Sequence, residues 1–366
     1  MIKNILAFLF FILITCLAQA SETDSTFGKW SLQSRADFGF IIAHRPALVP
    51  LQEGHVKGFE ITAQRQTTGT SDWENIFYYP SYGITTAVFD LGSPDHLGYG
   101  IAVYPFIDFP LSKRFGKGLH FRYGMGLGYI EKPFNAVTNI KNAAIGSHLN
   151  GVIHFDLHAE KAISKKSKLE LGAGITHYSN GSYELPNLGI NIATVNLAYH
   201  HSFGDNLAIK KREVPQTDNK LQVHIYAGGF LKKVYPPNGK RFFAGTLSGM
   251  LFKQVNPKSA WGLGTDLFYD KSLSYRIDKL EAGNTSSLNN FRPGIYGAYH
   301  LSIKHLGLMF NMGYYLYTKW KGDGNVYHRI CIRYYFDKTF LCVNLKTHYA
   351  KADFIEMGVG VRIGKK

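Results

Sequence analysis

The sequence has few cysteines, a shortage of acidic residues and almost no long hydrophobic runs. Only three cysteines occur in 366 residues, and one of them, Cys16, lies in the N-terminal leader described below. A small disulfide-stabilised module is therefore excluded. Lys and Arg outnumber Asp and Glu by 41 to 26, which gives a net charge of +15 with histidine uncharged. For an exported chain this charge favours a negatively charged membrane surface, and we expect no nucleic-acid partner.

The one long apolar run lies at the N-terminus. Residues 1–20 carry Lys3, an apolar stretch and the small-residue sequence Ala18-Gln19-Ala20, which is typical of a secretory signal peptide. Cys16 lies inside the apolar stretch, so a lipoprotein signal is the second interpretation. No later segment holds about 18 consecutive apolar residues, and the sequence therefore predicts no transmembrane helix.

Alternation of apolar and polar residues dominates the rest of the chain. Helical periodicity does not persist anywhere after the leader, whereas period-two alternation recurs at the length of a tilted strand that crosses a bilayer. This pattern predicts eight strands within residues 31–203 and a second series of eight within residues 221–364. The 23 Tyr and 26 Phe, many of them near strand ends, match the aromatic girdles of membrane barrels.

These patterns predict an all-β protein, a transmembrane antiparallel β-barrel. We expect a single barrel of about 14–16 strands, because tandem barrels in one chain are unusual; two tandem eight-stranded barrels are the alternative. A secreted β-sandwich is a third, weaker interpretation. After the signal peptide we expect three regions. Residues 21–203 form the first strand series, which carries the candidate site described below. A polar connector follows at 204–220, and a second, structural strand series occupies 221–366.

The most distinctive polar residues lie in the segment Lys168–Tyr199. An apolar row of alternate residues from Leu169 to Ile175 continues on the same face into His177 and Ser179. A histidine beside a serine can take its hydroxyl proton if a third group holds the imidazole. If this row faces lipid, the chemistry acts on a lipid. Spacing alone favours the plainer interpretation, a hairpin turn without catalytic meaning.

Polar groups in the following turn complete the candidate site. Asn180, Asn187 and the backbone amide of Gly189 are candidate oxyanion-hole donors. Asn191 begins the more apolar face of the next strand, at the same end of the strand as His177. The predicted chemistry requires neither a metal ion nor a cofactor.

The run His177-Tyr178-Ser179-Asn180, followed by Pro186-Asn187-Leu188-Gly189-Ile190, resembles the active-site signature of the lipid A 3-O-deacylase (PagL-type) and acyloxyacyl hydrolase family of outer-membrane enzymes. The resemblance implies an eight-stranded barrel with a Ser-His-Glu triad on its lipid-facing surface. By this match, His177 is the general base, Ser179 the nucleophile and Asn187 an oxyanion-hole donor.

The chain departs from this signature at the third triad position. The family's Glu falls on Asn191, whose amide can orient an imidazole but cannot stabilise an imidazolium by charge. Glu184, in the turn, is the nearest carboxylate and a candidate substitute. Because Asn191 replaces the family's Glu, we expect esterase activity to be reduced or lost.

The resemblance implies an esterase in the outer membrane of a Gram-negative bacterium. Its substrate would be an ester-linked acyl chain of lipid A, the anchor of lipopolysaccharide, and its surroundings outer-membrane lipid. Strand order places His177 and Ser179 near the extracellular leaflet, where lipopolysaccharide resides. The alternative function is a non-catalytic barrel, porin-like or a scaffold, that retains a relic of the site.

Cys331 and Cys342 flank a predicted tight hairpin around Phe336-Asp337. Equal spacing from this turn predicts that the two cysteines face each other directly on adjacent strands. Cβ atoms at directly opposed positions lie about 4.5–5.5 Å apart, slightly wider than a disulfide requires. The sequence therefore allows two interpretations, a disulfide bond or two free thiols that pack side by side.

Overall fold

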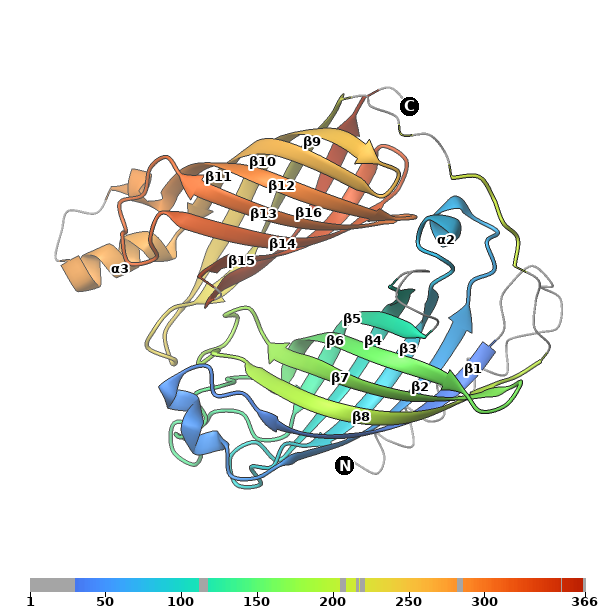
Figure 1. Cartoon of the computed structure of the whole chain (residues 1–366). Helices are drawn as coiled ribbons and strands as arrows, with labels where there is room; N and C mark the ends of the chain where they lie inside the picture. Colours follow the sequence, from blue (N-terminus) through green and yellow to red (C-terminus); the bar gives the residue numbers. More distant parts are fainter. Residues whose placement is uncertain are drawn as a thin grey trace.

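The protein forms two closed antiparallel barrels of eight strands each (Figure 1). The computed structural model describes residues 30–111, 118–204, 209–214, 217, 221–281, 286–349 and 351–364. The strands of the first barrel are β1 (Trp30–Ile41), β2 (Val56–Gln66), β3 (Ser81–Asp90), β4 (Tyr99–Pro110), β5 (Leu119–Ile130), β6 (Leu149–Ala162), β7 (Ser167–Ser179) and β8 (Ile190–Ser202). Those of the second are β9 (Leu221–Lys233), β10 (Arg241–Asn256), β11 (Ser259–Asp270), β12 (Phe291–Ile303), β13 (Leu306–Tyr315), β14 (Val326–Tyr335), β15 (Thr339–His348) and β16 (Lys351–Ile363). The predicted signal peptide, residues 1–20, lies outside the described residues.

The prediction of a single large barrel is wrong, and the alternative of two eight-stranded barrels is the observed arrangement. β8 pairs with β1, where Ile41 lies opposite Ile192. β16 pairs with β9 in the same way, where Gly358 lies opposite Gly228. In each sheet the first and last strands pair with each other, so their backbone N–H and C=O groups are hydrogen-bonded. β8 and β9 therefore have no free edge at which they could pair. Alternation reports which face a residue occupies but not which strand its neighbour is, so the sequence could not decide this point.

The polar connector predicted at 204–220 contains no strand among the residues that are described there. Two of its backbone amides donate to the first barrel. The Lys210 N–H bonds the Thr68 carbonyl oxygen at 2.7 Å, and the Arg212 N–H bonds Asn75 Oδ1 at 3.1 Å. The connector is thus held against the segment that contains the short helix α2 (Asp72–Ile76).

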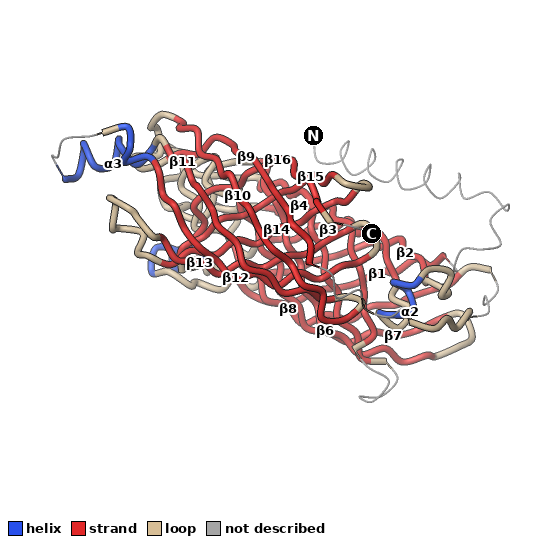
Figure 2. The backbone as a smooth tube through the Cα atoms, turned by 90° about the horizontal axis from the view of Figure 1, so that it is seen from above, coloured by secondary structure: helices blue, strands red, loops and turns tan. Residues whose placement is uncertain are grey.

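Among the described residues, helices are few and short (Figure 2). They are the 3₁₀ segments η1 (Pro46–Leu51) and η2 (Ser287–Asn290) and the α-helices α2 (Asp72–Ile76) and α3 (Ser272–Glu281). Within the described part of the chain, no helix has the length and apolar character that crossing a membrane requires.

Side chains along the strands alternate between an apolar outer face and a polar inner face. On β7, Leu171 is 67% exposed and Ile175 is 45% exposed, whereas Glu170 and Thr176 on the other face are buried. In a soluble barrel the apolar face would be the buried one. The observed inversion is that of a membrane barrel, whose outer wall contacts lipid.

Charged side chains occupy the interior of the first barrel. Arg35 Nη2 lies 3.3 Å from Asp156 and 3.7 Å from Glu170, and Arg122 Nη2 lies 2.9 Å from Asp108. All five side chains are buried. Buried charges are stable when they are paired, and an eight-stranded barrel is just wide enough for side chains to fill it. The interior is therefore a packed polar core.

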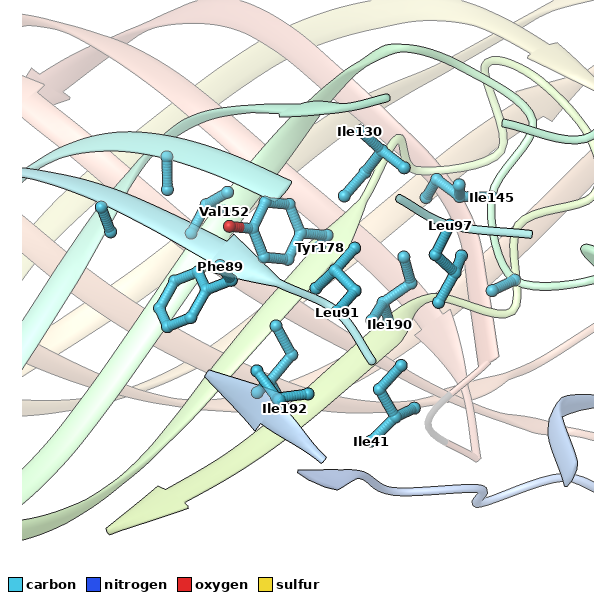
Figure 3. Close-up of a cluster of buried hydrophobic side chains, with 14 of the residues drawn as sticks. Ile41, Phe89, Leu91, Leu97, Ile130, Ile145, Val152, Tyr178, Ile190 and Ile192 are labelled. Carbon is cyan, nitrogen blue, oxygen red and sulfur yellow. The ribbon is translucent and has the colours of Figure 1, made fainter. Parts of the chain in front are cut away.

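An apolar cluster closes one end of this barrel (Figure 3). Leu48 and Leu51 of η1 pack there with residues from several strand ends. Tyr178, Ile190 and Ile192 belong to the same cluster and are buried. Because these residues alternate with outward-facing neighbours, their burial holds the backbone at the end of β7 and at the start of β8.

The predicted direct opposition of Cys331 and Cys342 is wrong. Cys331 lies opposite Asn344, and Cys342 lies opposite Arg333. The β14–β15 turn closes with a bond from the Phe336 N–H to the Thr339 carbonyl oxygen at 2.9 Å, which shifts the register by two residues from the predicted one. The two cysteines still share the inner face, where both are buried free thiols.

Candidate active site

His177 and Ser179 lie at the end of β7, on the outer wall of the first barrel. Both side chains are half-buried, and they follow the exposed apolar row that ends at Ile175. Tyr178, between them, points inward and is fully buried in the apolar cluster (Figure 3). The predicted placement of the pair on the apolar outer face is thus observed, because period-two alternation continues to the last residue of the strand.

A chain of hydrogen bonds holds the imidazole of His177. His177 lies directly opposite Asn191 on β8, and its Nδ1 is 2.6 Å from Asn191 Oδ1. Asn191 Nδ2 is 2.9 Å from Nδ1 of His44, whose Nε2 is 3.1 Å from the Leu188 carbonyl oxygen. A carbonyl can only accept, so His44 Nε2 donates to it and His44 Nδ1 accepts from the amide. The amide oxygen of Asn191 then accepts from His177 Nδ1, which leaves Nε2 of His177 as the basic nitrogen.

His44 joins the candidate site only in the folded structure. It follows β1 by three positions and is 147 residues from Asn191. The pairing of β1 with β8 brings the two together, and the Ile42 N–H also donates to the Asn191 carbonyl oxygen at 2.8 Å. No local pattern marks His44, because its role depends on barrel closure.

The backbone of Gly189 lies directly against the imidazole of His177. Its φ is +82°, a conformation that L side chains rarely adopt. A Cβ atom at this position would lie 2.6 Å from Cε1 of His177. The ring therefore rests on the bare backbone of the turn between β7 and β8, residues 180–189, hereafter the β7–β8 turn.

The hydroxyl of Ser179 is bonded within the β7–β8 turn. Asn187 Nδ2 donates to Ser179 Oγ at 3.1 Å, and the Gly181 N–H donates to it at 3.3 Å. Ser179 Oγ is also 3.4 Å from Asn187 Oδ1. Although His177 and Ser179 are both described, no hydrogen bond joins them directly. Such bonds are often long or poorly aligned in sites without substrate.

Of the three predicted oxyanion-hole donors, only Asn187 has its donor directed at Ser179. The Gly189 N–H donates to the Ala144 carbonyl oxygen at 2.9 Å. The Asn180 N–H donates to Asn187 Oδ1 at 3.0 Å, and Asn180 Nδ2 donates to Ser147 Oγ at 2.7 Å. These two residues fix the turn, while the Asn187 amide directs its nitrogen at Ser179 Oγ.

Glu184 does not lie behind His177. Its carboxylate is 2.6 Å from Lys233 Nζ and also pairs with Arg241, and both partners belong to the second barrel. The expectation that it substitutes for the family's acid is therefore not supported by its contacts. No sequence pattern indicates this ion pair, because the partners lie 49 and 57 positions further along the chain in another barrel.

Metal-ligating side chains converge elsewhere, inside the first barrel. Asp108, His120 and His158 form one such group, and His158, Glu160 and Glu170 form another. The carboxylates of Asp108 and Glu170 also lie 2.9 and 3.8 Å from Arg122 Nη2. These groups belong to the charged interior and have no part in the outer site.

Two family models match the chain. Residues 57–200 match the model of lipid A 3-O-deacylase (PagL), and this range contains His177, Ser179 and Asn191. Residues 219–366 match the model of the C-terminal domain of acyloxyacyl hydrolase, which spans the whole second barrel. A search of curated proteins gave no match.

Several solved barrels share a general likeness with the chain. Neisserial surface protein A (NspA) is 8% identical with a TM-score of 0.32, over 48% of this chain and 97% of that one. KdgM porin is 8% identical with a TM-score of 0.19, over 92% and 99%. OccAB4 of Acinetobacter baumannii is 12% identical with a TM-score of 0.24, over 94% and 100%. These scores are too low to bear on function. The two family matches together span most of the chain, and the chain belongs to the family of lipid A 3-O-deacylases and acyloxyacyl hydrolases.

Proposed function

We propose that this protein is an outer-membrane serine esterase that hydrolyses an ester-linked acyl chain of lipid A. The family implies lipid A deacylation and an outer-membrane barrel. The observation that carries the proposal is the position of Ser179, which ends an exposed apolar row on the outer wall of the barrel. A nucleophile in this position meets a substrate whose acyl chains already lie in the membrane, without extracting it.

The apolar row supports an acyl chain as the group bound next to the nucleophile. Ile175, two residues from His177, is 45% exposed on β7, and Phe155, opposite it on β6, is 42% exposed. Gly151 lies opposite Ser179 and leaves space beside the hydroxyl, since a Cβ there would meet no atom closer than 3.4 Å. An acyl chain of the substrate that lies along β6 and β7 on this outer face would place its ester group at the end of β7, beside Ser179.

In the first half of the reaction, Ser179 Oγ attacks the ester carbonyl carbon while Nε2 of His177 takes the hydroxyl proton. The negative charge that develops on the carbonyl oxygen is stabilised by the Nδ2 donor of Asn187, after a small shift from Ser179 Oγ. The tetrahedral intermediate then collapses, the alcohol oxygen of the ester leaves with the proton from His177, and an acyl-Ser179 ester remains.

In the second half, His177 takes a proton from water, and the resulting hydroxide attacks the acyl-serine carbonyl carbon. Collapse returns the proton from His177 to Ser179 Oγ and releases the free fatty acid. Each half uses His177 once as a base and once as an acid, so the enzyme ends the cycle in its initial state.

Asn191 takes the place of a carboxylate and acts by orientation. Its Oδ1 holds the proton on Nδ1 of His177 and so keeps Nε2 free to act as a base. The amide adds no negative charge to stabilise the imidazolium, and the proposed rate is therefore lower than a carboxylate at this position would allow.

The proposal is tested by mass spectrometry of lipid A from a Gram-negative host that expresses the intact chain, compared with Ser179→Ala and His177→Ala. Wild-type protein should give lipid A lighter by one acyl chain, and both variants should give the unmodified mass. Both side chains lie on the outer wall, so heat-modifiable gel migration should show that each variant still folds. Lipid A that is identical with and without the wild-type chain would support a non-catalytic barrel.

A further inference from the structure

The β7–β8 turn touches the second barrel at four consecutive residues. Gly181 lies so close to Ile355 of β16 that a Cβ on the glycine would collide with that side chain. The ring of Tyr183 lies 5.6 Å from the ring of Phe230 on β9, centroid to centroid, and Arg241 lies over it at 4.5 Å. The contacts of the other two residues, Ser182 and Glu184, are polar.

Ser182 is held in an unfavourable backbone conformation by the second barrel. Its φ is +65°, in the left-handed region that a residue with a side chain rarely adopts. Its carbonyl oxygen accepts the Lys233 N–H at 2.8 Å, and its Oγ donates to the Ala352 carbonyl oxygen at 3.2 Å. Such a conformation persists where the surroundings impose it, and both of these hydrogen-bond partners belong to β9 or β16.

Glu184 makes the strongest link. Its carboxylate bonds Lys233 Nζ at 2.6 Å and pairs with Arg241 at the start of β10. Glu184 is only 21% exposed and Lys233 only 15%, so solvent screens this pair less than a surface ion pair.

Hydrogen bonds lead from Glu184 to the nucleophile. The Glu184 N–H donates to Asn180 Oδ1 at 3.3 Å, and the Asn180 N–H donates to Asn187 Oδ1 at 3.0 Å. With its oxygen held there, the Asn187 amide turns its nitrogen toward Ser179 Oγ, at 3.1 Å. A displacement of Glu184 would therefore reach the oxyanion donor through two hydrogen bonds.

We propose that the second barrel positions the catalytic turn of the first, and that Lys233 and Arg241 act through Glu184 to hold Asn187 against Ser179. Glu184, Lys233 and Arg241 are positioning residues that touch neither the substrate nor the reacting atoms. This role rests on the proposed esterase function, and it gives the second barrel a part in catalysis rather than a purely structural one.

The test uses purified full-length protein in detergent and measures acyl release from lipid A in mixed micelles. Glu184→Gln, Lys233→Met and Arg241→Met should each lower kcat about tenfold, with KM within about twofold of the wild-type value, because small displacements of a catalytic donor cost rate rather than binding. The matched control is Lys168→Met. It removes a 2.8 Å ion pair with Glu160 at the opposite end of β7, and its kcat should be unchanged.

A charge exchange separates positioning from a general loss of structure. Glu184→Arg combined with Arg241→Glu should recover part of the kcat that either change alone removes, because the attraction between the two positions is restored. Each variant is first checked for heat-modifiable gel migration. Wild-type kcat in the three single variants, or no recovery in the exchanged pair, would overturn the inference while the esterase function stands. A wild-type chain no more active than Ser179→Ala would overturn both.

Discussion

Asn191 Nδ2 donates to His44 Nδ1 at 2.9 Å, and this bond decides which end of the amide faces His177. An asparagine side chain can rotate by half a turn and present a donor instead of an acceptor. His44 prevents that rotation, since its own Nε2 is committed to the Leu188 carbonyl oxygen at 3.1 Å. The neutral residue in the place of the family's acid is therefore fixed in the orientation that a base-catalysed mechanism needs.

Removal of His44 should lower activity without affecting the fold. His44→Ala leaves the Asn191 amide free to rotate, and kcat for lipid A should fall about fivefold, the equivalent of one neutral hydrogen bond worth about 1 kcal/mol. His44 is exposed, so thermal unfolding of the variant should match that of the wild type. An unchanged kcat would mean that Asn191 keeps its orientation unaided.

Replacement of Asn191 by glutamate should raise activity. A carboxylate adds charge behind His177 and can accept from Nδ1 with either oxygen, so it needs no partner to orient it. Asn191→Glu should therefore exceed the wild-type kcat, Asn191→Leu should fall below it, and His44→Ala should cost little when combined with Asn191→Glu. Equal rates for all three residues at position 191 would show that this position does not act on the imidazole.

The proposed oxyanion role of Asn187 can be tested with an isosteric change. Asn187→Asp keeps an oxygen to accept the Asn180 N–H but loses the Nδ2 donor that faces Ser179. By comparison with other oxyanion-hole donors, kcat should fall about 100-fold to 1000-fold. Initial rates of acyl release at varied lipid A concentration would give kcat and KM for the purified variant. A loss confined to KM would assign Asn187 to substrate binding instead.

A side chain at Gly189 should displace the imidazole. The Cβ of Gly189→Ala would lie 2.6 Å from His177 Cε1, so kcat should fall by at least about tenfold. Gly204→Ala is the matched control. Gly204 also has a positive φ, +74°, but no atom lies within 4 Å of the added Cβ. The two variants share the cost of backbone strain, and only the first should lose activity in the acyl-release assay.

The cysteines of the second barrel should both be reactive after unfolding. Cys331 lies opposite Asn344 rather than Cys342, and both thiols are free in the structure. Labelling of denatured, unreduced protein with a maleimide should therefore modify two thiols in the mature chain. Labelling of neither would establish a disulfide between them.

The outward position of Ser179 could be inferred from the sequence by itself. Residues from Leu169 to Ser179 alternate with period two, and a strand places every second residue on one face, whatever its neighbours are. The same argument placed sixteen strands in two series, and the structure contains eight in each barrel. Resemblance to the deacylase signature then gave His177, Ser179 and Asn187 their proposed roles.

The tertiary structure alone decided how the barrels close and what surrounds the site. The backbone hydrogen bonds between β1 and β8 carry no sequence signature, so neither the closure at eight strands nor the contact of His44 with Asn191 could be predicted. By its sequence position Glu184 is a candidate substitute acid, whereas in the structure its charge is paired with Lys233 and Arg241 of the second barrel. Alternation along one strand determines the face of each residue, while contacts between distant strands depend on the three-dimensional path of the whole chain.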